Sequence, residues 1–299
     1  MAQVGIMVEG QEDLTWERWH RFVDLTESLG YESLWRSDHL TSLEGEAGRE
    51  ALEIWVSLST LATRTSRIRF GPMVSPITFR HPSIVAKMAA SIDRLSGGRL
   101  ELGLGAGWHR GEHQAFGIPF PPLAVRFEML EEGLQVIRAL WAEDNVSFDG
   151  VHYRLEDVTC YPRPLQTPRP PIIIGGNGER RTLPLVATYA DEWNGLSLDP
   201  PSYRAKREVL RARCEEIGRD PASVKCSWMG SILIGRDESE LRARLERILG
   251  VLTSKREVTP TSTRGSLVER GWLAGTPSQV IEQMQRMEEA GAQRFMLQL

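Results

Sequence analysis

The sequence predicts a single (β/α)8 barrel, also called a TIM barrel, that spans residues 1–299 as one domain. Three observations predict this fold. Short apolar segments alternate with amphipathic segments eight times along the chain. Several apolar segments have no polar face, as at Ile172, Ile173 and Ile174, which is typical of a parallel strand covered on both sides. Glycine ends several amphipathic segments just before the next apolar one.

The predicted strands are the short apolar segments, at residues 4–8, 33–35, 68–74, 100–104, 171–174, 192–196, 224–234 and 295–297. The helices predicted to follow them lie at about residues 15–29, 50–64, 82–95, 124–141, 179–189, 202–217, 238–250 and 277–290. In the first helix, Phe22, Leu25 and Leu29 fall near one face. Thr15 is a suitable cap for its start, and Gly30 is suited to the left-handed conformation that ends it.

Two connections are too long for simple turns, so we expect insertions at about residues 142–170 and 251–276. The first contains a run of prolines that favours an extended path over the surface. The second is rich in Ser, Thr, Lys and Arg, which fits either a lid over the barrel mouth or a solvated loop without a role.

Charge and composition limit the possible partners. The formal net charge of -4 gives no basic field for nucleic acid or an anionic membrane, so we expect a small-molecule substrate. Cys160, Cys214 and Cys226 are widely spaced and odd in number, which argues against a disulfide framework or a zinc knuckle. The first residues lack a basic start followed by a long apolar segment. We therefore expect a cytoplasmic protein.

The loops that follow the strands converge at one face of a barrel, so we expect the active site there. Asp38 and His39 follow the second strand. Histidine can hold or pass a proton near neutral pH, which makes His39 the candidate catalytic residue. The alternative is an aspartate that caps the loop beside a histidine satisfied by backbone.

Glycine-rich segments follow the fourth and fifth strands. The segment Gly175, Gly176, Asn177, Gly178 precedes a helix, so its amides are suited to binding a phosphate. A tight turn is the alternative. Trp108 occupies the position of the last glycine of a dinucleotide-binding motif, which excludes that motif. The indole ring of Trp108 is suited to packing against a planar ligand, although Trp108 is also a candidate core residue.

A zinc-hydrolase motif also needs consideration. His109, Glu112 and His113 match the pattern H-x-x-E-H, which requires a regular helix. Gly111 disfavours that helix by about 1 kcal/mol. We therefore expect no metal site.

The chain resembles the luciferase-like monooxygenase superfamily, and within it the coenzyme F420-dependent oxidoreductases. The similar phrases follow the family's order along nearly the whole chain, at residues 35–40, 76–82, 95–100, 102–108, 116–121, 171–178, 190–194 and 275–277. The resemblance implies a barrel that binds a deazaflavin, or alternatively FMN, in its mouth, and it implies a homodimer.

The resemblance also implies roles for individual residues. Asp38 and His39 would lie by the cofactor ring, with His39 as proton donor or substrate-orienting group. Met73 falls where relatives often have a cis peptide behind the ring, and Ser75 would bond to the cofactor. Independently of the resemblance, the ring of Trp108 makes it a further candidate for binding the cofactor. The residues implied to bind the phosphate tail are Ala106, Gly107, Gly175, Gly176, Asn177 and Gly178.

One departure from the family pattern limits the expected reaction. Relatives that oxidise alcohols or sugar phosphates carry a glutamate where Trp108 stands and a tryptophan where Leu43 stands. A missing acid removes the base for hydroxyl oxidation, so we expect a reductase or a dehydrogenase of another substrate, using F420. The alternatives are an FMN-dependent monooxygenase and a non-catalytic protein that binds flavin or F420.

Overall fold

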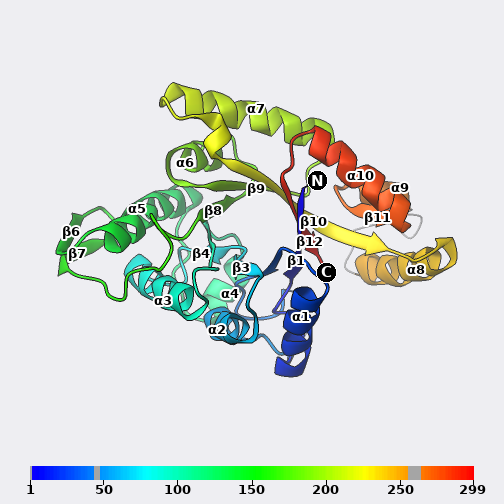
Figure 1. Ribbon diagram of the computed structural model, residues 1–299, viewed down its shortest axis with the longest axis horizontal. Coiled ribbons are helices and arrows are strands. Elements are labelled where there is room, and N and C mark those ends of the chain that lie inside the picture. Colours follow the sequence, from blue (N-terminus) through cyan, green and yellow to red (C-terminus); the bar gives the residue numbers. More distant parts are fainter. Residues whose placement is uncertain (1, 44–47, 255–263) are drawn as a thin grey trace.

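The protein forms a parallel β-barrel inside a layer of helices, in a computed structural model that describes residues 2–43, 48–254 and 264–299 (Figure 1). The strands of the main sheet are β1 (Gln3–Val8), β2 (Ser33–Arg36), β3 (Arg69–Pro72), β4 (Ser75–Pro76), β5 (Leu102–Gly105), β8 (Ile172–Gly175), β9 (Glu192–Leu196), β10 (Lys225–Ile234) and β12 (Arg294–Gln298). Their order in the sheet is β3-β2-β1-β12-β10-β9-β8-β5-β4, and each neighbouring pair is parallel.

β3 and β4 occupy one strand position, which closes the barrel. Phe70 of β3 forms a parallel bridge with Leu100, and the Glu101 amide donates to the Phe70 carbonyl oxygen at 2.9 Å. Met73 and Val74 separate the end of β3 from β4, and β4 then pairs with β5. The ring therefore has eight strand positions, and the predicted (β/α)8 barrel is confirmed.

The helices lie outside the strands around the ring (Figure 1). They are α1 (Trp16–Ser28), α2 (Ile54–Arg64), α3 (Pro82–Leu95), α4 (Arg110–Ala115), α5 (Leu123–Ala142), α6 (Thr182–Tyr189), α7 (Pro200–Glu216), α8 (Glu238–Ser254), α9 (Arg264–Glu269) and α10 (Pro277–Glu289), with a short 3-10 turn at Pro221–Ser223. α1 begins as predicted, because the Thr15 hydroxyl accepts from the Arg18 amide at 3.2 Å. Among the described residues, no helix combines the length and the apolar character that crossing a membrane requires.

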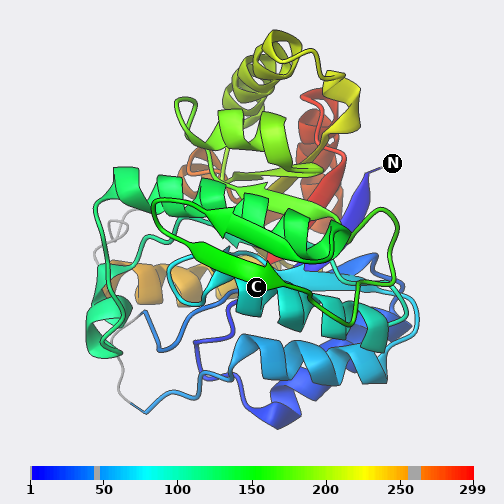
Figure 2. The same ribbon diagram turned by 90° about the vertical axis from the view of Figure 1, so that its left-hand side faces the viewer.

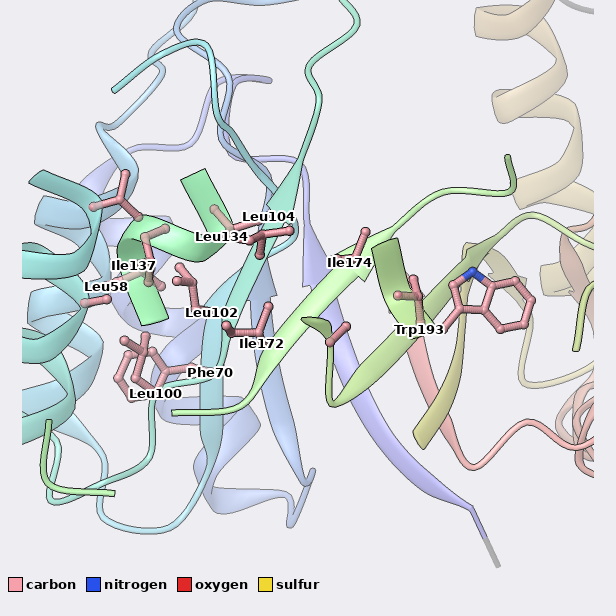
Figure 3. Packing of buried hydrophobic residues seen from close by; sticks show 14 of the residues in the cluster. Leu58, Phe70, Leu100, Leu102, Leu104, Leu134, Ile137, Ile172, Ile174 and Trp193 are labelled. Atoms are coloured by element: carbon pink, nitrogen blue, oxygen red, sulfur yellow. The ribbon is translucent and has the colours of Figure 1, made fainter. Parts of the chain in front are cut away.

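The apolar core consists of two clusters, one on each side of the barrel wall. The outer cluster lies between strands and helices, and it contains Leu102 and Leu104 of β5 together with Leu134 of α5 (Figure 3). Neighbouring residues of a strand face opposite sides, so Ile172 belongs to the outer cluster and Ile173 to the inner one. The inner cluster joins residues from strands around the ring, namely Met7, Trp35, Met73, Ile173, Met229 and Met296.

The two predicted insertions have different outcomes. Residues 142–170 contain a hairpin of β6 (Val146–Asp149) and β7 (Arg154–Val158), drawn in green beside α5 in Figure 2. Residues 251–276 include α9 (Arg264–Glu269) and the short strand β11 (Leu273–Gly275), which pairs in parallel with the end of β10 off the main ring. The central part of the predicted lid, residues 255–263, lies outside the described residues.

The amino ends of the strands carry a buried charge network centred on Arg294, the first residue of β12. Its guanidinium donates to Glu101 at 2.6 Å, to Glu192 at 2.8 Å and to Glu32 at 2.8 Å. Arg69 of β3 also donates to Glu101. Burial raises the pKa of Glu192 to about 7, although the charge of Arg294 opposes this shift. The network ties several strands together at this end of the barrel.

Candidate active site

The loops at the carboxyl ends of the strands meet around Val74, between β3 and β4. A Cβ atom on Gly105 of β5 would lie only 2.6 Å from Val74 Cγ2, so this close approach requires glycine. A Cβ atom on Gly175 of β8 would lie 3.2 Å from Val74 Cγ1. The peptide bond between Met73 and Val74 is cis, at the position that the family resemblance implied. These predicted loops therefore share one rim of the barrel.

Asp38 is buried at this rim and is held by two polar side chains. Arg80 donates to its two carboxylate oxygens at 2.6 and 3.2 Å, and the Ser75 hydroxyl donates to one of them. Arg80 also donates to Glu53 of the loop before α2, at 2.7 Å. Burial raises the pKa of the Asp38 carboxyl, while the charge of Arg80 works against that shift. Bidentate pairing of this kind fixes the position of the loop after β2.

His39 forms a buried pair with Glu112. The distance between His39 Nδ1 and Glu112 Oε1 is 2.8 Å, and the Leu40 amide donates to Glu112 Oε2 at 3.0 Å. The Glu112 side chain is 1% exposed, and that of His39 is 12% exposed. Among the described residues, His39 Nε2 has no hydrogen-bond partner, so it is the nitrogen that remains for a ligand.

The surroundings of this pair favour its charged form. Burial alone would lower the pKa of His39, but the hydrogen bond and charge of Glu112 raise it above its ordinary value, helped by Glu9 and Asp38. Burial alone would raise the pKa of Glu112, but its bonds to His39 and Leu40 lower it. A histidine that its neighbours stabilise in the protonated form is suited to holding and passing a proton.

α4 delivers Glu112 to His39, and its existence corrects the prediction from Gly111. His109 caps the helix, because its Nδ1 accepts from the Glu112 amide at 3.3 Å. The loss caused by Gly111 is only about 1 kcal/mol. A cap contributes a similar amount, and the bonds that Glu112 makes add to it.

The helix does not bring the zinc motif together. His113 Nδ1 lies 2.7 Å from the His109 carbonyl oxygen, and its Nε2 lies 2.8 Å from the Thr78 hydroxyl. Both ring nitrogens of this buried histidine are therefore occupied within the protein. Within residues 2–43, 48–254 and 264–299, no group of three His, Cys, Asp or Glu side chains is placed to hold a metal. This arrangement gives the zinc-hydrolase alternative no support.

Trp108 is 67% exposed beside His39, so it is not the core residue that was the alternative prediction. The two ring centroids are 5.9 Å apart, and the rings meet edge to face. Gly107 precedes Trp108 with a φ of +75°, and its carbonyl oxygen accepts from Arg126. Ala106 is partly buried against the outer core. An exposed indole beside a histidine offers a flat surface to a planar ligand.

The loop after β8 is shaped by Asn177, whose side chain pairs with the backbone of Leu196 at 2.9 and 3.0 Å. Gly176 has a φ of +125°, which only glycine adopts readily. In the part of the chain that the structure describes, the amides of Asn177, Gly178 and Thr182 have no hydrogen-bond partner. α6 begins at Thr182, slightly later than predicted. The loop therefore presents unpaired amides at a helix start, as a phosphate site requires.

The structure brings some of the predicted site residues into contact with one another, and it places two further residues in the site that sequence reasoning missed. Asp38 bonds to Ser75, and His39 lies beside Trp108. Arg80 and Glu112 were missed. Glu112 was considered only as part of the zinc motif. The signal that could have identified it is its position in the first turn of a helix that follows the carboxyl end of β5.

A family model matches most of the chain. Residues 1–294 match the model of the luciferase-like monooxygenase family.

Individual relatives include proteins that use either of two cofactors. The chain is 37% identical over 166 residues to an F420-dependent glucose-6-phosphate dehydrogenase of Amycolatopsis mediterranei, which covers 55% of this chain and 47% of the relative. It is 34% identical to an FMNH2-dependent dimethylsulfone monooxygenase of Pseudomonas putida, over 56% of this chain and 45% of the relative. It is 30% identical to an F420-dependent hydroxymycolic acid dehydrogenase of Mycobacterium tuberculosis, over 80% of this chain and 65% of the relative. The chain thus spans less than two thirds of each relative's length.

Solved structures share the fold at lower identity. An F420-dependent secondary alcohol dehydrogenase, in complex with an F420-acetone adduct, superposes with a TM-score of 0.83 at 20% identity, over 99% of this chain and 93% of the other. A coenzyme F420-dependent tetrahydromethanopterin reductase of Methanopyrus kandleri gives a TM-score of 0.81 at 19% identity, with the same coverage. With a family model matched over nearly its full length and this barrel architecture, the chain belongs to the luciferase-like monooxygenase family.

Proposed function

We propose that this protein is an F420-dependent oxidoreductase that transfers a hydride between the deazaflavin and a small organic substrate in the barrel mouth. The observation that carries the proposal is His39, whose Nδ1 is bonded to Glu112 and whose Nε2 is left for a ligand beside the exposed Trp108. The F420-dependent relatives, at 37% and 30% identity, support F420 as the cofactor.

The residues at the rim fit a planar, phosphorylated cofactor. The exposed Trp108 and the segment of Met73 and Ser75 would hold the ring, with Asp38 and His39 beside it. Unpaired amides in the loop after β8 would bind the phosphate tail. The residues proposed for this tail site are Ala106, Gly107, Gly175, Gly176, Asn177 and Gly178. When bound, the cofactor supplies the hydride acceptor or donor.

The chain's own groups would orient the substrate and handle its proton. His39 Nε2 would donate a hydrogen bond to a substrate oxygen, or accept its proton. Asp38, held by Arg80 and Ser75, would keep the His39 loop in place. Because Asp38 is buried and already paired, we assign it a role in holding this loop.

The structure removes the reason for excluding hydroxyl oxidation. The sequence places Trp108 where some relatives carry an acid, and this suggested that no acid accompanies His39. Glu112 supplies a carboxylate 2.8 Å from His39 Nδ1, from the helix that follows Trp108. Alcohols and carbonyl compounds therefore belong in the substrate panel.

Cofactor titration tests the proposal directly. Purified protein is titrated with F420 and, separately, with FMN, while fluorescence and absorption are followed. We expect tight binding of F420, and turnover of it with at least one alcohol or electron-poor compound of a broad panel. Tight binding of FMN without binding of F420 would contradict the proposed cofactor.

An FMN-dependent monooxygenase is the second candidate. The dimethylsulfone monooxygenase relative, at 34% identity, favours it. It predicts that one atom of labelled O2 is incorporated into the product when reduced FMN and substrate are supplied, which an F420 oxidoreductase does not show. Binding of either cofactor without any turnover would instead indicate a non-catalytic binding protein. The one-domain organisation, the cytoplasmic location and the homodimer stay predictions.

A further inference from the structure

Among the described residues, Glu112 is the acid that directly contacts the candidate catalytic histidine, and the sequence did not assign it to the site. Both of its oxygens are engaged, Oε1 by His39 Nδ1 at 2.8 Å and Oε2 by the Leu40 amide at 3.0 Å. The carboxylate therefore forms hydrogen bonds with two successive residues of the loop after β2. Its near-complete burial keeps water from competing for these bonds.

The contact determines which nitrogen of His39 carries a proton. A carboxylate can only accept, so Nδ1 must donate, and the neutral ring then has Nε2 as an acceptor. When the ring is protonated, Nε2 becomes a donor instead. The two nitrogens lie on different edges of the imidazole, so binding one to Glu112 turns the other away from it.

Other charged groups near the pair do not replace Glu112. Glu9, after β1, and Asp38, next in the chain, add weaker electrostatic contributions to His39. His109 Nδ1 lies 3.7 Å from Glu112 Oε1 and accepts from the Glu112 amide. Asp38 is itself occupied by Arg80. Among these groups, only Glu112 forms a hydrogen bond with the His39 ring.

We propose that Glu112 is a positioning residue that holds His39 Nδ1–H and thereby presents Nε2 for proton exchange with a substrate oxygen. This inference rests on the proposed function. In the oxidative direction, the substrate O–H bond breaks and its proton moves to Nε2. The adjacent C–H bond gives its electron pair and hydrogen as hydride to oxidised F420, and a C=O bond forms. Reduction reverses each transfer.

Glu112→Gln tests the charge while keeping an acceptor at the same place. NMR of the ring nitrogens of ¹⁵N-histidine-labelled protein, with and without F420, reports the tautomer and the pKa of His39. We expect wild type to carry the proton on Nδ1 when neutral. We expect the pKa of His39 to fall in the variant, because burial then acts with less opposition.

The chain offers a matched control in Glu128→Gln. Glu128 lies 3.2 Å from His152 Nε2 on the surface, outside the barrel mouth. We expect this change to leave the titration of His39 and the turnover unchanged. An Nε2–H tautomer of His39 in wild type, or an equal pKa of His39 in Glu112→Gln and wild type, would overturn the proposal.

Kinetics separate positioning from a merely structural role. We expect Glu112→Gln to lower kcat about 10- to 100-fold with little change in KM, and to move the limb of the pH profile due to His39 toward lower pH. Glu112→Asp should recover part of the loss. In the background of His39→Gln, Glu112→Gln should have no further effect on kcat, and an additive loss would contradict action through His39.

The two proposals fail in different ways. If neither F420 nor FMN binds and no substrate turns over, the proposed function fails. The NMR titration still decides whether Glu112 controls the tautomer of His39. If F420 turns over normally in Glu112→Gln, the proposed function stands and the role of Glu112 falls.

Discussion

The two ends of the barrel use the same kinds of residue for different purposes. At the amino ends of the strands, Arg294 donates to Glu101, Glu192 and Glu32, and of these four residues only Glu32 is partly exposed. At the carboxyl ends, Glu112 is paired with His39, but a ring nitrogen of that histidine has no partner within the described residues. Buried ion pairs alone do not identify a site. The amino-end cluster also leaves Arg294 Nε, Glu192 Oε1 and Glu32 Oε2 without a partner among the described residues, but these atoms are buried. His39 differs because its unpartnered nitrogen belongs to a partly exposed side chain beside Trp108 at the barrel mouth.

This difference follows from the loops at each end. Most amino ends follow short turns after helices, such as the turn at the left-handed Gly30 that ends α1, and β8 is the exception because the insertion with the β6–β7 hairpin precedes it. The carboxyl ends lead into longer loops that carry α4, the loop of Asp38 and the segment after β8. The closed end is therefore expected to control folding, and the open end to control binding, and four predictions test this separation.

Arg294→Met should produce the largest effect. It leaves the buried Glu101 and Glu192 without their main partner, which should lower the free energy of unfolding by about 3–5 kcal/mol. Urea denaturation measures the change. Arg286→Met removes an exposed pair with Glu282 and should cost less than about 0.5 kcal/mol. Equal losses for the two variants would contradict the role of the network.

Glu192→Gln should change the pH dependence of stability. The pKa of Glu192 in the folded protein, about 7, lies above its ordinary value of 4.5, so the folded state binds the proton more tightly. Its stabilising contribution is present below about pH 4.5 and is lost as pH rises through about 7. Between about pH 5 and about pH 8, wild type should lose about 2 kcal/mol relative to the variant. Urea denaturation at each pH gives the free energy of unfolding of both proteins. A difference between wild type and variant that stays constant over this pH range would contradict the raised pKa of Glu192.

Gly176→Ala should weaken binding at the open end. The φ of +125° at this residue is strained for alanine by about 1–2 kcal/mol, so the loop should move and lose its phosphate contacts. Affinity for F420 should fall more than affinity for a deazaflavin that lacks the phosphate. Gly30→Ala is the matched control, because Gly30 has a φ of +83° at the end of α1. It should reduce stability without changing affinity.

Trp108→Ala should have the smallest effect on free energy. The exposed indole should contribute about 1 kcal/mol to binding of the cofactor ring, or roughly a fivefold change in Kd. Stability should change by less than about 0.5 kcal/mol. Trp16→Ala, which alters another partly exposed tryptophan on α1, should leave Kd unchanged. A large loss of stability in the Trp108 variant would mean that the indole supports the fold.

Much of the fold could be predicted from local pattern. α3 forms over Pro82–Leu95, as its apolar spacing predicted, because the proline and the flanking loops define its ends. The uninterrupted apolar run at Ile172, Ile173 and Ile174 was also informative, since both sides of β8 are covered. β11 was missed, because so short an apolar segment is ambiguous without its partner β10.

The site was less predictable, because its contacts join residues that are distant in sequence. Asp38 and His39 could be found because they follow a strand directly. Arg80 reaches Asp38 across 42 residues, and Glu112 reaches His39 across 73, and no local spacing encodes either contact. Local propensity also gave the wrong sign at Gly111, because tertiary bonds outweighed its modest helix penalty.

Val74 sets the spacing between two segments of the barrel mouth. Its methyl groups touch the glycines of β5 and β8 and sit at the break in the closing strand, but the residue has no proton to exchange. A bulkier side chain there would push two segments apart at once, and a smaller one would leave space under both. We expect a substitution at Val74 to change the spacing of these two segments while leaving the contact between His39 and Glu112 in place.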